Sequence, residues 1–347
     1  MGMTLYSEII EQPECIGSLL ISQKKNMEQI ASAIHKRDIQ YVFLAARGTS
    51  DNAGRYANYL LGALNGLPLA LATPSLFTYY KQPPKLKNAL VVGISQSGQS
   101  PDIVSVLEEG KRQNCLTLAI TNEPKSSLAQ SADYVIDIQA GVEKAVAATK
   151  TYTTELMSVA MLSVAVGENK RYWQELGKVA GWMRPVLKQD DFIAQLAQRY
   201  RYMDQTIVLG RGFNYATAFE WALKLKELTY VKAEPYSSAD FAHGPIAMVE
   251  KGFPVMAIAP KGKVFDSMLQ MLKRLHEEFS AELVVISNDK KALALAQTPL
   301  TIPADVPEWL SPLVSILPAQ LFAYYLTLAK GFNAEQPRSI RKVTKTK

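Results

Sequence analysis

The sequence predicts an α/β protein with two tandem, doubly wound parallel sheets of the flavodoxin-like type and additional helical segments. Short apolar runs alternate with longer helical patterns such as 101–113, and this alternation is typical of parallel βαβ units. The pattern also repeats: Gly48 follows an apolar run and has a counterpart in Gly212, 164 residues later, and Ile94 has one in Ile258 at the same offset. The 347 residues suffice for two domains of about 150 residues each.

The same patterns divide the chain into five predicted segments. These are a helical extension at 1–35, the first repeat at 36–168, a helical connection at 169–203, the second repeat at 204–331 and a tail at 332–347. The extension and the connection carry apolar residues at helical spacing, with polar residues between them. This spacing favours helices that pack on the repeats or on a partner chain.

Composition indicates an ordinary globular protein, because 48% of the residues are hydrophobic and 20% are charged. The formal net charge of +6 forms no basic stripe with interleaved aromatic residues, so we expect no nucleic-acid partner. The only cysteines are Cys15 and Cys115, which favours a reducing compartment. Without the pattern of a signal peptide at the N-terminus, the expected location is the cytoplasm.

The apolar segment 309–329 is the nearest approach to a membrane span. Pro312 and Pro318 interrupt it, and Ser315 and Gln320 lie within it. This composition fits a buried helix of a globular domain better than a transmembrane helix. We therefore expect no association with a membrane.

A hydroxyl-rich loop at 95–100, Ser-Gln-Ser-Gly-Gln-Ser, follows a predicted strand at 89–94 and opens a helix. It offers backbone N–H groups, three hydroxyls and the positive end of a helix dipole to an anion. It lacks the lysine of a nucleotide P-loop, so the predicted anion is a phosphomonoester. An ordinary capping loop is the alternative. The second repeat has Ala-Pro-Lys-Gly at the equivalent 259–262, so only one phosphate site is expected.

A charged cluster in the second repeat suits proton transfer. On a helix, Glu220, Lys224 and Glu227 fall on one face, which brings carboxylates and an ammonium within reach of each other. Enolisation needs a base that moves a proton between neighbouring carbons and a cation that stabilises the developing negative charge. Glu227 and Lys224 supply these two groups. The alternative is a solvated ladder of salt bridges.

His243 is set apart from the other histidines by its loop context, followed by Gly244 and Pro245. A histidine of this kind can open a sugar ring by general acid–base transfer, or it can be a hydrogen-bonded structural residue. His35 and His276 occur in polar helical contexts and are expected at the surface. No Cys, His or Asp cluster has the spacing of metal ligands, so no metal or other cofactor is expected.

Together these motifs resemble the tandem sugar-isomerase (SIS) domains that form the isomerase half of glucosamine-6-phosphate synthases. The resemblance covers nearly the whole chain. The segments that carry it are 8–13, 48–50, 95–100, 147–150, 222–227, 243–245, 336–338 and Lys342.

The resemblance implies roles for individual residues. The sugar phosphate would be held by Thr49, Ser50, Ser95, Gln96, Ser97 and Ser100. Glu227 would move the proton between C1 and C2, Lys224 would steady the intermediate, and His243 would open the ring. Lys342 would approach the open-chain sugar, and the sugar would be lined by Val146, Ala147 and Arg47.

Two departures from the synthases favour another reaction. The chain as given carries no glutaminase domain with a terminal cysteine nucleophile, so glutamine would not supply ammonia. Arg47 stands where the synthases have cysteine, and the segments 47–54 and 237–240 resemble the glutaminase-free glucosamine-6-phosphate deaminases built on SIS domains. The expected reaction is therefore conversion of glucosamine 6-phosphate to fructose 6-phosphate and ammonia, through ring opening and C1–C2 proton transfer.

Three alternatives stay open at this stage. The chain could be a deglycase for fructosamine phosphates, or a deaminase or isomerase for another hexosamine phosphate. It could also be a sugar-phosphate sensor without catalysis, although such regulators usually join a DNA-binding domain to a single SIS unit. The resemblance further implies a homodimer with shared active sites, in which the histidine loop of one subunit completes the site of the other.

Overall fold

The computed structural model describes residues 4–342. The chain divides into two compact units. The first-sheet unit holds residues 14–143 and 150–178 together with residues 341–342 of the C-terminal tail. The second-sheet unit holds residues 4–13, 144–149 and 179–340.

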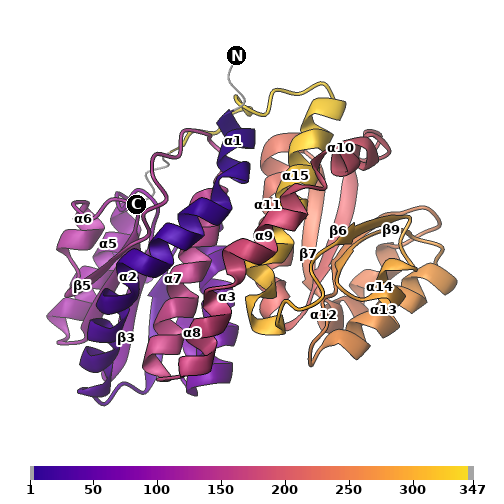
Figure 1. Ribbon diagram of the computed structural model, residues 1–347. Helices are drawn as coiled ribbons and strands as arrows, with labels where there is room; N and C mark the ends of the chain where they lie inside the picture. The colour runs from indigo at the N-terminus through magenta and orange to yellow at the C-terminus, as the bar shows by residue number, and fades with distance from the viewer. Residues whose placement is uncertain (1–3, 343–347) are drawn as a thin grey trace. The chain divides into compact units, whose positions relative to one another are not determined.

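The first-sheet unit is built on five parallel strands in the order β2-β1-β3-β4-β5 (Figure 1). The strands are β1 (Tyr41–Ala45), β2 (Leu69–Leu71), β3 (Ala89–Ile94), β4 (Leu116–Thr121) and β5 (Tyr134–Asp137). β3 and β4 are buried along their whole length, as expected for inner strands covered by helices on both faces. This order is the flavodoxin-like one, in which the direction of winding changes between β1 and β3.

Helices cover both faces of this sheet. They are α2 (Gln12–His35), α3 (Thr49–Asn65), α4 (Ser75–Thr78), α5 (Pro101–Arg112), α6 (Ser127–Gln130), α7 (Lys150–Val166) and α8 (Lys170–Leu176). The first two residues of α2 are counted with the second-sheet unit. On one face, Ile103 and Leu107 of α5 pack against Val91 of β3. A Cβ atom on Gly93 would lie 2.7 Å from Leu107 Cδ1, so β3 needs a glycine there for α5 to pack this closely.

The second-sheet unit repeats this topology with parallel strands in the order β10-β9-β8-β6-β7. The strands are β6 (Gln205–Gly210), β7 (Lys232–Ser237), β8 (Pro254–Ile258), β9 (Glu282–Ser287) and β10 (Thr298–Thr301). β6, β8 and β9 coincide with the apolar runs that repeat those of β1, β3 and β4. The predicted α/β fold with two doubly wound sheets is thus confirmed.

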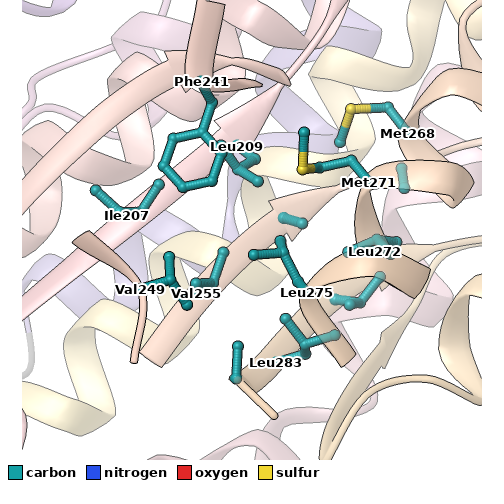
Figure 2. Packing of buried hydrophobic residues seen from close by; sticks show 14 of the residues in the cluster. Ile207, Leu209, Phe241, Val249, Val255, Met268, Met271, Leu272, Leu275 and Leu283 are labelled. Atoms are coloured by element: carbon teal, nitrogen blue, oxygen red, sulfur yellow. The ribbon is translucent and has the colours of Figure 1, made fainter. Parts of the chain in front are cut away.

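The helices of the second-sheet unit are α1 (Thr4–Ile10), α9 (Val179–Leu187), α10 (Asp190–Gln198), α11 (Tyr215–Lys224), α12 (Ser238–Ala242), α13 (Phe265–Glu277), α14 (Lys290–Leu293) and α15 (Ser311–Ala329). Three of them, α1, α9 and α10, lie in the predicted extension and connection. Figure 2 shows Met268, Met271 and Leu275 of α13 facing Ile207 and Val255 of the sheet. This cluster is the core on one face of the second sheet.

Helix α15 corresponds to the apolar segment 309–329. With the preceding turn it forms a stretch, Glu308–Ala329, that is long and apolar enough to cross a membrane. Of its most apolar window, 83% is buried inside the protein, so the expectation of a buried helix is confirmed. Gln320, in the middle of α15, accepts a hydrogen bond of 2.7 Å from the side chain of Gln12.

Candidate active site

The hydroxyl-rich loop at 95–100 joins β3 to α5 and is folded by its own side chains. The backbone N–H of Gly98 donates to both the carbonyl and the hydroxyl oxygen of Ser95, each at 3.2 Å. Gly98 has a φ of +59°, and a Cβ atom there would lie 2.0 Å from Ser126 Oγ. Only glycine lets the loop turn this closely over Ser126, whose hydroxyl caps α6.

A second turn lies beside this loop. β1 and β3 are neighbouring parallel strands, with Ala45 opposite Gly93, so the turns that follow them meet at the same edge of the sheet. Thr49 and Ser50 begin α3 on the first of these turns. The structure therefore places all six predicted phosphate-binding residues on two adjacent turns at the switch point of the first sheet.

Ser50 is held by a carboxylate that sequence reasoning missed. Its hydroxyl donates a hydrogen bond of 2.8 Å to Oε1 of Glu155, which is buried in α7. A glutamate in the middle of a helix that is otherwise apolar or hydroxylic is the signal that could have identified it. This bond fixes the direction of the Ser50 hydroxyl.

Arg47 precedes the first turn and reaches the helix that follows the loop. Its Nε donates a hydrogen bond of 2.9 Å to Oδ2 of Asp102, in the first turn of α5. Asp102 is fully buried, whereas 49% of the Arg47 side chain is exposed. Sequence reasoning missed Asp102, because residues 55 positions apart give no local signal.

In the second-sheet unit, Lys224 ends α11 and Glu227 lies in the next turn. Lys224 Nζ donates a hydrogen bond of 2.5 Å to Glu227 and lies 3.4 Å from a carboxylate oxygen of Glu220. Lys224 and Glu220 are buried, whereas 25% of the Glu227 side chain is exposed. This burial contradicts the alternative interpretation, in which the three residues form a solvated ladder of salt bridges.

The backbone around Glu227 is unusual. α11 continues into a π-helical turn, η2 (Leu225–Thr229), which ends at Tyr230 in a left-handed conformation. A π-helical turn inserts extra backbone into the helical register and occurs frequently at functional sites. It turns Glu227 out of the fully buried environment of Lys224 while the two side chains stay in contact.

His243 ends α12 and is exposed. Its ring makes no hydrogen bond to any of the described residues 4–342. The alternative interpretation, a structural histidine held by a hydrogen bond, is therefore not supported within this part of the chain. His35 and His276 are exposed on helices, as expected. The described part of the chain contains no group of three or more His, Cys, Asp or Glu residues that could hold a metal ion.

Val146 and Ala147, predicted to line the sugar, lie in the segment 144–149, which belongs to the second-sheet unit. The backbone N–H groups of Lys144 and Ala145 donate to the buried carboxylate of Glu8 in α1, at 2.5 and 3.2 Å. Val146 is half-buried and Ala147 is buried. Glu8 thus fixes the irregular segment that contains Val146 and Ala147.

Lys342 is held in the first-sheet unit. Its Nζ forms an ion pair with Glu143, which is buried and also accepts hydrogen bonds from the backbone N–H and the hydroxyl of Thr151. Sequence reasoning missed Glu143, which lies 199 residues from its lysine partner. The ion pair anchors the start of the C-terminal tail.

Comparisons with known proteins agree with this architecture. The sequence pattern of the SIS domain matches residues 37–165 and 201–330. Over 97% of its length the chain is 30% identical to the glutamine–fructose-6-phosphate aminotransferase (isomerizing) of Francisella tularensis, and it spans 58% of that protein's length. The Thermus thermophilus enzyme of the same name is 31% identical over the same shares of the two chains.

A solved structure also matches this chain along nearly its whole length. The C-terminal domain of the F. tularensis glucosamine–fructose-6-phosphate aminotransferase matches with a TM-score of 0.86 and 29% identity, over 97% of this chain and 99% of that one. The part of the curated relatives that this chain matches is thus their isomerase half. The chain belongs to the SIS-domain family and carries two SIS domains in tandem.

Proposed function

We propose that the protein is a phosphosugar isomerase-deaminase that converts glucosamine 6-phosphate and water to fructose 6-phosphate and ammonia. The observation that carries the proposal is the buried Lys224 in contact with the partly exposed Glu227. An ammonium beside a carboxylate, shielded from water, is the pair that enolisation of a sugar requires.

The phosphate end of the substrate is assigned to the two turns of the first sheet. Their hydroxyls and backbone N–H groups, at the start of α3 and α5, suit a phosphate group. The residues are Thr49, Ser50, Ser95, Gln96, Ser97 and Ser100. Val146 and Ala147 would line the sugar.

The reaction then runs in four steps. His243 moves a proton from O1 to O5 as the ring opens to the aldehyde. Glu227 takes the proton from C2, while Lys224 stabilises the negative charge that develops on O1. Glu227 returns the proton to C1 while one proton passes from the amino nitrogen to O1, which leaves the C1 hydroxyl and an imine at C2. Water adds to this imine and releases ammonia and fructose 6-phosphate. Lys342 would assist at the open-chain sugar.

The test is to supply the purified protein with glucosamine 6-phosphate and to measure ammonia and fructose 6-phosphate together. Equal amounts of both products are expected, with unphosphorylated glucosamine inactive. Galactosamine 6-phosphate and a fructosamine phosphate serve as competing substrates. Faster turnover of either would replace the proposed substrate, and tight binding of all of them without turnover would identify a sensor.

We also propose a homodimer with shared active sites, in which the His243 loop of one subunit serves the Glu227 of its partner. The exposed ring of His243 supports this, since it is open to a group outside its own chain. Mixing inactive Glu227→Gln and His243→Asn proteins under exchange conditions should restore up to about a quarter of the wild-type activity, because half of each mixed dimer is intact. Absence of any recovery in verified mixed dimers would contradict sharing.

A further inference from the structure

The phosphate-binding turns offer only neutral donors from their own residues. Thr49, Ser50 and the residues of the loop at 95–100 contribute hydroxyls, amides and backbone N–H groups but no cation. Proteins commonly bind a phosphate dianion with arginine, whose planar fork donates two parallel hydrogen bonds. A cation beside these turns would therefore decide how strongly the phosphate group is held.

Arg47 is placed to be that cation. It adjoins the first turn, and its Nε is fixed on Asp102 in the first turn of the helix that follows the second. Its two terminal nitrogens make no hydrogen bond with any residue between 4 and 342, and 49% of the side chain is exposed. The Arg47 charge also reaches the first turn of α3, where it opposes the effect of burial, which raises the pKa of Asp51.

The second repeat has an arginine at the equivalent position, but its side chain has a different hydrogen-bond partner. Arg211 lies 164 residues after Arg47, at the equivalent turn, and its Nη1 donates a hydrogen bond of 2.5 Å to the hydroxyl of Ser267 at the start of α13. The loop at 259–262 there carries no hydroxyl groups. In the second repeat, which lacks the hydroxyl-rich loop, a terminal nitrogen of Arg211 thus donates to a protein group. In the first repeat, which has that loop, both terminal nitrogens of Arg47 are available to a ligand.

We propose that the terminal nitrogens of Arg47 bind the phosphate group of the substrate, and that Asp102 is the positioning residue that aims them. This rests on the proposed function only for the identity of the sugar. Because Asp102 compensates the charge of Arg47, the pair contributes directed donors more than long-range attraction. It favours a phosphate ester over a neutral sugar or a singly charged acid.

The test measures binding of inorganic phosphate and of glucosamine 6-phosphate by calorimetry, beside kcat and KM. The variant Arg47→Met/Asp102→Asn removes both charges, so no buried carboxylate is left unpaired, and thermal unfolding checks its fold. Both dissociation constants and KM should rise about tenfold or more, a loss of about 1.4 kcal/mol, with kcat within about twofold. Arg47→Lys should recover only part of the affinity, because lysine lacks the fork.

Arg211→Met is the matched control, and its phosphate affinity should equal that of the wild type. Three results would overturn the inference: no phosphate binding by the wild type, unchanged affinity in the double variant, or equal losses in the double variant and Arg211→Met. Failure of the proposed reaction is a separate outcome. Phosphate binding that depends on Arg47, without ammonia release, would leave this inference intact and remove the deaminase proposal.

Discussion

Lys224 Nζ lies 2.5 Å from a carboxylate oxygen of Glu227, and the lysine side chain is only 1% exposed. Glu220, fully buried, lies 3.4 Å from the same ammonium. The three groups differ in what they can reach. Glu220 is buried and holds the ammonium, whereas 25% of the Glu227 side chain is exposed.

Removal of the ammonium should therefore damage stability as well as activity. Lys224→Met leaves buried carboxylate charge without its cation, and we expect a loss of about 3–5 kcal/mol in the free energy of unfolding. Lys226→Met is the control, because Lys226 is exposed in the same turn and should change stability by no more than about 0.5 kcal/mol. Urea unfolding measures both. Similar midpoints for the two variants would show that Lys224 is not the ion-paired residue described.

The phosphate affinity should depend on the acceptor that Glu155 offers to Ser50. Glu155→Gln keeps an oxygen at this position, so phosphate binding should stay within about threefold of the wild type. Glu155→Leu leaves the buried hydroxyl of Ser50 without this acceptor, at a cost of about 1–3 kcal/mol, and the turn that presents the backbone N–H groups of Thr49 and Ser50 to the phosphate loses this anchor. Calorimetry with inorganic phosphate distinguishes the two variants. Equal affinities for both would exclude a role of Glu155 in orienting Ser50.

Local patterns in the sequence predicted the fold and part of the candidate site. Buried strands of parallel sheets are continuous apolar runs, and these recur in the two halves, so both sheets could be predicted. The contact between Lys224 and Glu227 could also be predicted, since helical spacing brings residues three apart together. The limits of the segments and the binding roles stay predictions.

The partners of the site residues could not be predicted. Glu155 meets Ser50 across 105 residues of chain, and Glu143 meets Lys342 across 199, and only the folded topology creates such contacts. The π-helical turn at Leu225–Thr229 has no propensity signal of its own. The predicted helical connection at 169–203 contains three helices, α8, α9 and α10, and their bounds could not be predicted, because Asn169 caps one start and short turns separate the rest.

Stability at alkaline pH should depend on Tyr6. Its hydroxyl donates a hydrogen bond of 2.7 Å to Asp190, and this bond, with burial, raises the pKa of Tyr6 from 10.0 to about 12. The neutral phenol is thus favoured in the folded state, so its contribution is complete below about pH 10 and is lost as the pH rises through about 12.

Tyr6→Phe should lower the melting temperature below pH 10 and make the decline above pH 10 shallower than in the wild type. Tyr325 donates to the other oxygen of Asp190, and burial together with the same carboxylate raises the pKa of Tyr325, so some decline should remain in the variant. Melting curves across this range measure the effect. Parallel declines for the two proteins would mean that the pKa of Tyr6 is the same in the folded and the unfolded state.

Glu227→Gln gives the most direct test of the central claim, that Glu227 carries the proton between C1 and C2. The amide preserves the shape of the side chain but cannot act as a base. We predict that ammonia release from glucosamine 6-phosphate falls by about 10²–10⁴-fold, while the dissociation constant for this sugar phosphate stays within about twofold. Turnover at the wild-type rate by Glu227→Gln would exclude Glu227 as the group that carries the proton.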